Sequence, residues 1–345
     1  MRLTPVAFLF ALGLQTGLAD AKCVPTPVPV VSVDLPSRYE DGSKTRSEID
    51  EAANAQVNKV LEPVDEFVSV LARQTTDALR LAKIGEREKA QLLADCVMAG
   101  LERWAKANAL SRLTSVNARL AIPSRVAGAA FAYALASPLA SRKEAQRKAI
   151  SAWLVRQANE TVKFFDDPKT PPRAARNNLR MWAALSVLRT GLTVKDNSLV
   201  KWSEDSFRRT LCTASKDGSM PLEMERGPLA LHYQLYATQP LVVGVALLKA
   251  NGKDLSKICN NALQRIVGFT LDAIDDPGLA STRAGVVQKR PRGKSSLQAH
   301  ELAWIPAWQS LGLSPSLKGY APSKMTLSNS KLGGNQTLIW EKPKS

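Results

Sequence analysis

The chain has 345 residues, of which 45% are apolar, and it carries 47 Lys and Arg against 31 Asp and Glu, a formal net charge of +16. This length allows one large domain or two smaller ones, and the apolar fraction excludes a globally disordered chain. The charge predicts an affinity for polyanions, because a strong positive field raises their local concentration.

The first residues predict export from the cytoplasm. Met1 and Arg2 precede a short apolar run over 6–12, and a small-x-small triplet follows at 19–21, which is typical of a secretory signal peptide. The run is too short for a permanent membrane anchor, although an uncleaved interfacial anchor is an alternative. We therefore expect removal of residues 1–21 and a periplasmic or secreted bacterial protein. Such a protein meets acidic polysaccharides, so nucleic acid is not the expected partner.

The remaining residues, 22–345, are expected to form a single all-α domain. Residues 22–45 are rich in Pro, Val and Ser and predict an extended arm, whereas apolar residues recur at helical spacing from about residue 46. The stripes are Leu61, Val64, Phe67, Val68, Val70 and Leu71; Ala90, Leu93, Val97, Leu101 and Trp104; Ala127, Ala130, Phe131, Ala134 and Leu135; and Ala149, Trp153, Val155, Ala158 and Val162. Further helices are expected at about 174–191, 197–214, 227–250 and 254–274, separated by Pro- and Gly-containing breakers. Such helical pairs either stack as a solenoid or close into a toroid.

The C-terminal residues 281–345 predict a basic loop followed by an extension. Five basic residues lie among glycines and serines over 281–298, which predicts a mobile loop: Arg283, Lys289, Arg290, Arg292 and Lys294. Residues 333–340 predict a short extended segment.

The four cysteines, Cys23, Cys96, Cys212 and Cys259, predict disulfides because the chain is expected to be exported. Three pairings are possible. Cys23–Cys96 is favoured because it would tie the N-terminal arm onto a helix, which leaves Cys212–Cys259. The chain has no CxxC pair, only two histidines and no His/Asp/Glu cluster with ligand spacing, so we expect neither a metal nor another cofactor.

Two segments resemble the active-site segments of the alginate lyase family (polysaccharide lyase family 5). They are residues 177–182, NNLRMW, and residues 223–237, EMERGPLALHYQLYA. Shorter matches in the same order, including residues 37–40 and 333–334, extend the resemblance over most of the mature chain, and Cys23 and Cys96 fall where relatives carry a disulfide. The resemblance implies an incomplete α/α toroid with a central cleft and a lid loop within residues 22–60. We expect a monomer that binds an anionic polysaccharide, alginate-like or containing glucuronate.

The family cleaves polyuronates by β-elimination, in which C5 loses a proton and the oxygen at C4 departs. The chemistry requires a base, an acid and a group that neutralises the uronate carboxylate. The resemblance implies that Tyr233 is base, acid or both, that Asn178 donates to the carboxylate, and that Arg226 binds it and favours a phenolate. Arg226 lies seven residues before Tyr233, so both would share a helix face. From the residues alone, the plainer interpretations are a helix cap for Asn178, a buried core residue for Tyr233 and a surface charge for Arg226.

The same resemblance implies a set of substrate-binding residues. Tyr39 and Arg38 belong to the segment that resembles a lid loop. Trp182 is either a sugar-stacking platform or a core residue, Arg180 could supply charge from another helix face, and His232 is expected beside Tyr233 as a supporting residue rather than a base.

Leu179 stands where the family writes a histidine, in the pattern Asn-Asn-His-x-Tyr-Trp. A leucine cannot donate, accept or carry charge, so one catalytic group is missing. The sequence predicts a polyuronate lyase that acts through Tyr233 on mannuronate- or glucuronate-type bonds. The alternative is a weakened or inactive anionic-polysaccharide-binding protein of an exopolysaccharide system.

Overall fold

The computed structural model describes residues 21–315, 317, 320 and 325–341, so the predicted signal peptide lies outside the described residues except for its last one. Helices dominate the described chain, which confirms the all-α prediction. They are α1 Glu51–Lys83, α2 Arg87–Lys106, α3 Val116–Ala121, α4 Pro123–Ala136, α5 Glu144–Asp166, α6 Asn178–Val194, α7 Asn197–Thr213, α8 Pro221–Met224, α9 Ala230–Ala250, α10 Ile258–Asp275, α11 Gly278–Ala284, α12 Ile305–Leu311 and α13 Gln336–Trp340.

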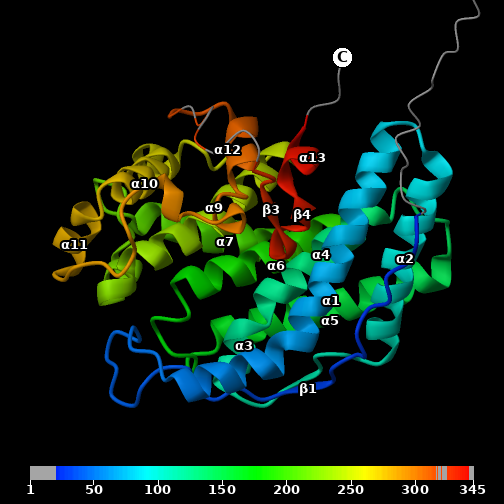
Figure 1. Ribbon diagram of the computed structural model, residues 1–345, viewed down its shortest axis with the longest axis horizontal. Coiled ribbons are helices and arrows are strands. Elements are labelled where there is room, and N and C mark those ends of the chain that lie inside the picture. The colour runs from blue at the N-terminus through cyan, green and yellow to red at the C-terminus, as the bar shows by residue number, and fades with distance from the viewer. Residues whose placement is uncertain (1–20, 316, 318–319, 321–324, 342–345) are drawn as a thin grey trace, which may run out of the picture.

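Short 3-10 turns and two-residue strands complete the described elements. The turns are η1 Gly227–Leu229, η2 Lys294–Ser296, η3 Ala299–Glu301 and η4 Ser330–Leu332, and the strands are β1 Ser32–Val33, β2 Arg112–Leu113, β3 Ser328–Asn329 and β4 Gly334–Asn335. β1 pairs with β2 in parallel, and β3 pairs with β4 antiparallel. The first pair fastens the N-terminal arm along the helical body (Figure 1).

Helix α6 lies at the centre of the described fold, where it contacts α4, α5, α7 and α9 (Figure 1). Its buried residues lie on all sides of the helix, as do those of α9, because a helix enclosed by other helices needs no polar face. The N-terminal ends of both helices open toward a common pocket, which is described below. The helices of the core therefore place two sequence-distant segments side by side.

The predicted apolar stripes of α1 and α2 are buried throughout. The stripe predicted for α5 is partly displaced, because Ala149, Val155 and Val162 are half-buried and the buried face runs instead through Ile150 and Leu154. Helix α9 begins at Ala230, after the 3-10 turn η1, rather than at residue 227.

The C-terminal predictions need correction. Residues 281–284 complete helix α11, and the following loop is tied down: Lys289 Nζ donates to Ser47 O at 3.1 Å, and Arg290 forms a two-pronged ion pair with Glu301. The sequence pattern shows the basic residues but not their partners. In the segment 333–340, only Gly334–Asn335 is extended, and a helix, α13, follows because Asn335 caps it.

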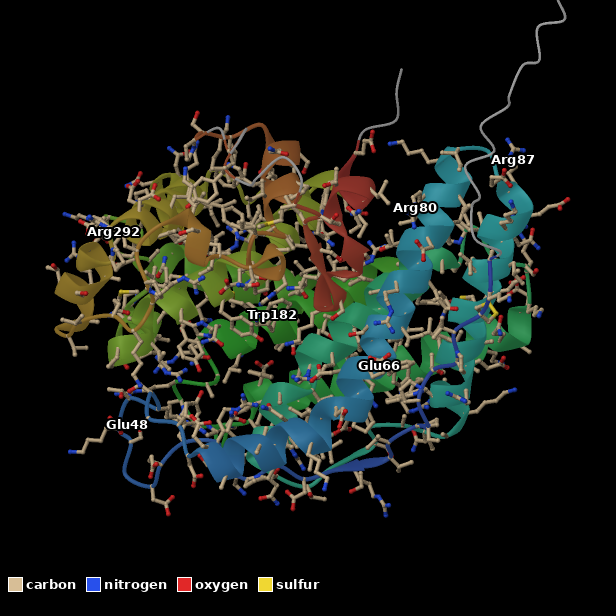
Figure 2. All side chains as sticks on the ribbon, in the orientation of Figure 1. Glu48, Glu66, Arg80, Arg87, Trp182 and Arg292 are labelled. Atoms are coloured by element: carbon tan, nitrogen blue, oxygen red, sulfur yellow. A yellow bond between two sulfur atoms is a disulfide. The ribbon has the colours of Figure 1, made fainter. Side chains whose placement is uncertain are left out.

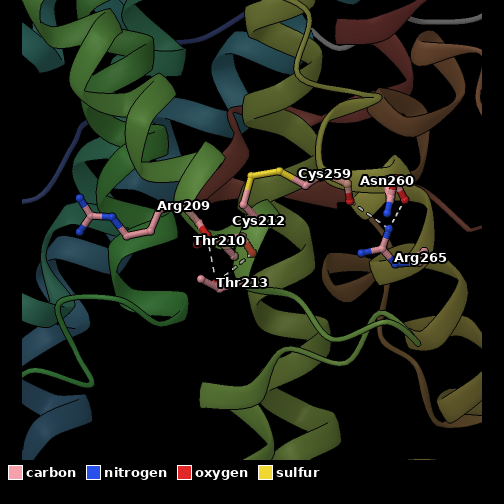
Figure 3. The surroundings of a disulfide bond; sticks show 7 residues. All are labelled: Arg209, Thr210, Cys212, Thr213, Cys259, Asn260 and Arg265. Atoms are coloured by element: carbon pink, nitrogen blue, oxygen red, sulfur yellow. Dashed lines mark hydrogen bonds between the residues drawn. A yellow bond between two sulfur atoms is a disulfide. The ribbon is translucent and has the colours of Figure 1, made fainter.

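Both predicted disulfides, Cys23–Cys96 and Cys212–Cys259, are present. The first fastens the N-terminal arm to α2. The second joins the end of α7 to the start of α10, where Cys259 and the two asparagines after it adopt left-handed backbone conformations (Figure 3).

The C-terminal segment 328–340 packs into the helical body instead of extending from it. The contacts of η4 with α4 and of β4 with α1 place it across these two helices (Figure 1). Gly128 in α4 permits the approach, since a Cβ there would lie 2.5 Å from Ser330 O and 2.3 Å from Val68 Cγ1. This close packing fixes η4, and with it Lys331, beside the pocket.

None of the described helices combines the length and apolar character that crossing a lipid bilayer requires.

We predict that Gly128→Ala lowers the free energy of unfolding by about 1–3 kcal/mol, because the added methyl group overlaps backbone that cannot move freely. Chemical denaturation followed by circular dichroism would show a lower midpoint. The matched control is Gly268→Ala in α10, where no atom lies within 4 Å of the added Cβ and a gain of about 0.5–1 kcal/mol is expected. Equal midpoints for the two variants would contradict the close packing.

Candidate functional site

A pocket lies between the lid loop, residues 36–50, and the helical body. Its lining comes from the lid loop, the α3–α4 region, the start of α6, the face of α9 around Tyr233, and Lys331. A backbone bridge between Tyr39 and Ile49 and a hydrogen bond from Glu40 N to Glu48 O, 3.1 Å, hold the lid loop as a hairpin-like turn. Glu48 marks this loop at the edge of the molecule, whereas Trp182 lies near its centre (Figure 2).

Two tyrosines from distant parts of the chain meet in this pocket. The hydroxyls of Tyr39 on the lid loop and Tyr233 on α9 lie 2.6 Å apart. Arg226 joins them: its Nη2 donates to the Tyr39 hydroxyl at 3.2 Å, and its guanidinium carbon lies 3.6 Å from the Tyr233 ring centroid. The sequence prediction that associated Arg226 with Tyr233 did not foresee Tyr39 as their shared neighbour.

Arg226 does not share a helix with Tyr233, which corrects the sequence argument from their spacing. The residue follows α8 and precedes η1, and Gly227, with φ +55°, turns the chain between the two elements. Its Nε donates to Thr45 O at 2.9 Å and its Nη2 to Arg46 O at 2.6 Å. Arg226 therefore holds the lid loop, and with it Tyr39, against Tyr233.

The pKa values of the two phenols are shifted in opposite directions. Burial raises the pKa of Tyr39, but the charge of Arg226 and the hydrogen bonds from Tyr233 and Arg226 outweigh it, so this pKa lies below the usual 10.0. Burial and a negative charge on Tyr39 raise the pKa of Tyr233 despite Arg226. When the pair loses one proton, the charge therefore rests on Tyr39, and Tyr233 keeps its hydrogen.

Asn178 is fully buried at the start of α6 and is bound by a carboxylate that the sequence analysis missed. Glu223 Oε1 accepts from Asn178 N at 2.7 Å, and Oε2 accepts from Asn178 Nδ2 at 2.8 Å. A carboxylate is favourable there because helix N-termini carry partial positive charge. Burial raises the pKa of the Glu223 carboxyl to about 7, although hydrogen bonds from Asn178 and the charge of Arg226 act in the opposite direction.

This arrangement joins the two segments that the sequence analysis singled out. Asn177 caps α6 by accepting from Leu179 N at 3.0 Å, so the cap is the residue before Asn178. The Oδ1 atom of Asn178 has no hydrogen-bond partner among the described residues. Glu223 belongs to the second matched segment. The signal available in the sequence was an acidic residue among the apolar neighbours of residues 221–224, PLEM.

The other predicted site residues divide between the pocket and its surroundings. Leu179, Arg38 and His232 line the pocket, as does Trp182, but Trp182 is only 1% exposed and packs against Tyr236. Burial, followed by the charge of Arg290, lowers the pKa of His232 below its usual 6.5.

Arg180 lies outside this pocket. Its guanidinium donates to Phe165 O, to Ser206 Oγ and to Asp166 Oδ1, all within 3.0 Å, so it fastens α6 to the end of α5 and to α7. The structure therefore does not bring Arg180 together with Tyr233.

The charge of the pocket has one sign. Among the described residues that line it, seven are basic and none is acidic; the basic ones are Arg38, Lys44, Arg46, Arg125, Arg173, Arg226 and Lys331. A pocket lined by charges of one sign attracts anions, and its low-dielectric walls focus the electric field. Lys331 and Tyr236 were not among the predicted site residues. In the described part of the chain, no three His, Cys, Asp or Glu side chains gather closely enough to hold a metal ion.

Comparisons with known proteins agree on one family. The sequence profile of the alginate lyase family matches residues 34–279. A polysaccharide lyase of Stenotrophomonas maltophilia is 28% identical over 330 residues, covering 94% of this chain and 93% of the relative. An alginate lyase of Pseudomonas putida is 28% identical over 302 residues, covering 86% of this chain and 78% of the relative.

Solved structures share the fold. Alginate lyase A1-III from Sphingomonas species A1 superposes with a TM-score of 0.73 at 24% identity, covering 95% of this chain and 88% of the other. A tyrosine-to-phenylalanine variant of alginate lyase A1-III, complexed with tetrasaccharide, superposes with a TM-score of 0.76 at 23% identity, covering 96% and 90%. The predicted α/α toroid is thereby confirmed.

We predict that an ultraviolet titration of the phenolates shows one tyrosine ionising below pH 10, because Arg226 stabilises the charge on Tyr39. Tyr39→Phe should remove this transition, and Arg226→Met should move it to higher pH. Tyr236→Phe is the matched control, since burial raises the pKa of Tyr236. A transition that survives in Tyr39→Phe would disprove the assignment.

Proposed function

The chain belongs to the alginate lyase family, and we propose that it is a polysaccharide lyase that cleaves mannuronate- or glucuronate-type bonds by β-elimination. One observation carries this proposal: the Tyr39–Tyr233 pair and Arg226 lie in a pocket whose seven charged lining residues are all basic. The positive wall suits a polyuronate, and the phenol pair supplies a group that can take and return a proton.

The tyrosine pair accounts for both proton transfers in the proposed reaction. Tyr233 takes the proton from C5 while its own proton passes along the 2.6 Å hydrogen bond to the Tyr39 phenolate. The C5 electron pair forms the C4–C5 double bond, and the C4–O bond breaks. Tyr233 then gives a proton to the departing oxygen and recovers one from Tyr39, so the pair ends as it began. Substrate loses one hydrogen at C5 and gains one at the leaving oxygen.

The carboxylate next to C5 must be neutralised, since otherwise the C5 proton is too weakly acidic. We assign this role to Arg226 and Asn178. The Asn178 side chain is positioned by Glu223, which accepts one hydrogen of its Nδ2 group. Leu179 contributes no polar atom beside Asn178, so a slower reaction is expected than with a third donor. The intact tyrosine pair favours an enzyme over the binding protein considered as the alternative.

Stereochemistry selects the substrate. In β-D-mannuronate and β-D-glucuronate the C5 hydrogen and the C4 oxygen lie on the same face of the ring, so Tyr233 reaches both. In α-L-guluronate they lie on opposite faces, and a second group is needed on the far side. Leu179 lines the pocket but offers no polar group for that role, so we expect guluronate linkages to be spared.

We further propose that the protein acts in the periplasm or outside the cell as a monomer, after removal of residues 1–21. Two disulfides fit an oxidising compartment. The proposed monomer rests on the pocket itself, to which a single chain supplies the tyrosine pair, Arg226 and the basic wall.

We predict that purified protein produces the ultraviolet absorbance of an unsaturated uronate from polymannuronate or polyglucuronate, and at least tenfold less from polyguluronate. Tyr233→Phe should lower kcat by about 10²–10⁴-fold, because it removes the group that moves both protons. Trp202→Phe, a substitution outside this pocket, is the control for effects of protein preparation. Equal cleavage of polyguluronate, or an unaffected Tyr233→Phe variant, would overturn the mechanism.

We also predict that Leu179→His raises kcat/KM on polymannuronate by about 10- to 100-fold, because an additional donor beside Asn178 would stabilise the charge that develops at the carboxylate. Leu179 is half-buried and faces the pocket, so an imidazole has access to substrate. Leu179→Met is the matched control, since it keeps the volume but adds no strong donor. An increase of the same size in both variants would assign the effect to packing.

A further inference from the structure

We propose that Lys331 binds a second carboxylate of the polymer, on the sugar next to the one that reacts, and so makes the protein selective for consecutive uronates. The inference rests on the proposed function for the identity of the ligand. Lys331 lies beyond residues 34–279, which match the family profile.

The pocket around Tyr233 continues into a second pocket. His232, Tyr236 and Lys331 line both. The second pocket is otherwise formed by Gln239, His300, Glu301, Ser328, Asn329 and Ser330. A polymer that occupies the first pocket can therefore extend past Lys331 into the second.

The spacing along α9 matches one sugar unit. Tyr236 follows Tyr233 by three residues, which places it about 4.5 Å further along the helix axis, a distance comparable to one sugar ring. The rings of His232 and Tyr236 are nearly parallel, with centroids 6.3 Å apart. A sugar that follows the reacting one along this face lies beside Tyr236, where Lys331 enters the cleft.

Lys331 is available for an anion. Among the described residues, its ammonium group has neither an acidic partner nor a hydrogen-bond acceptor, whereas its backbone N–H donates to Asn329 Oδ1 at 3.0 Å. The close packing of η4 on Gly128 further fixes its position. Because the backbone is held in place, little order has to be imposed on it when a ligand binds.

The charges around Lys331 leave an excess of positive charge. Arg125 on α4 and Arg38 on the lid loop face it, and Asp65 on α1 is the acidic group that faces it. Asp65 is already paired with Arg125, Nη2 to Oδ2, at 2.8 Å. Burial, with the charges of Arg125 and Arg38, lowers the pKa of Lys331 to about 7, while Asp65 acts in the opposite direction.

A bound carboxylate would reverse this effect. A negative charge beside the amine favours its protonated form, so binding is tightest where Lys331 is already charged and weakens as the pH rises above 7. His232 and His300 also line the second pocket, and burial lowers the pKa of His232 below its usual 6.5. They remain unchanged in variants of Lys331, so comparing such variants separates their contribution.

The test measures binding of a mannuronate tetrasaccharide by calorimetry at pH 6 and pH 8.5, with Tyr233→Phe as the background so that the probe survives. Lys331→Met should raise the Kd about tenfold or more at pH 6, because a charge-assisted contact is lost, and less at pH 8.5. Lys331→Arg should bind as tightly as the background protein at pH 6 and more tightly than it at pH 8.5, because a guanidinium stays charged there. Lys216→Met, an exposed lysine outside both pockets, should have no effect. A neutral mannose tetrasaccharide should have the same Kd for the background protein and for Lys331→Met.

Other outcomes separate this inference from the proposed function. If binding depends on Lys331 but the protein with its native Tyr233 has no lyase activity, the result supports the inference and refutes the proposed enzyme. An unchanged Kd in Lys331→Met at pH 6, or an equal loss at both pH values that Lys331→Arg does not restore, would overturn the inference. No binding to the background protein would overturn it as well.

Discussion

The guanidinium of Arg226 is the constraint on which the rest of the site depends. It touches both phenols of the Tyr39–Tyr233 pair and also donates to two carbonyl oxygens of the lid loop, those of Thr45 and Arg46. A charge in a partly buried site acts strongly because little water screens it. The same contact therefore closes the loop over the cleft and separates the acidities of the tyrosines, so that position and reactivity are coupled.

The two ends of the chain complete a cleft whose floor is the central helices. The lid loop supplies Tyr39, α6 and α9 supply Asn178 and Tyr233, and the C-terminal segment supplies Lys331. Gly128 and the disulfide of Cys23 to Cys96 hold these outer segments on the helical body. A polysaccharide-binding surface of one charge sign thus arises from segments that are remote in sequence but rigidly placed.

The sequence predicted the helical architecture because apolar spacing is a local signal. Four cysteines left three pairings open, and the favoured one is the one present. The sequence associated Tyr233 with Arg226 correctly, but by a helical spacing that the turn at Gly227 breaks. Glu223 and Lys331 were missed because their importance comes from tertiary packing: a buried carboxylate at the start of α6, and an amine brought to the cleft by η4. Arg180 shows the converse, since a charged residue within the first matched segment is paired with Asp166 outside the cleft.

The central claim is that Arg226 acts through the tyrosine pair. The most direct test is a double-mutant cycle of Arg226→Met and Tyr233→Phe, measured as kcat on polymannuronate in proteins whose unfolding midpoints match. When two residues act as a unit, the effects of substituting them on the activation free energy are not additive. We expect Arg226→Met to lower kcat by at least tenfold less in the Tyr233→Phe background than in the wild-type protein, because only its contact with the substrate carboxylate is left to lose. Multiplication of the two single effects would show that Arg226 and Tyr233 work independently and would contradict the account.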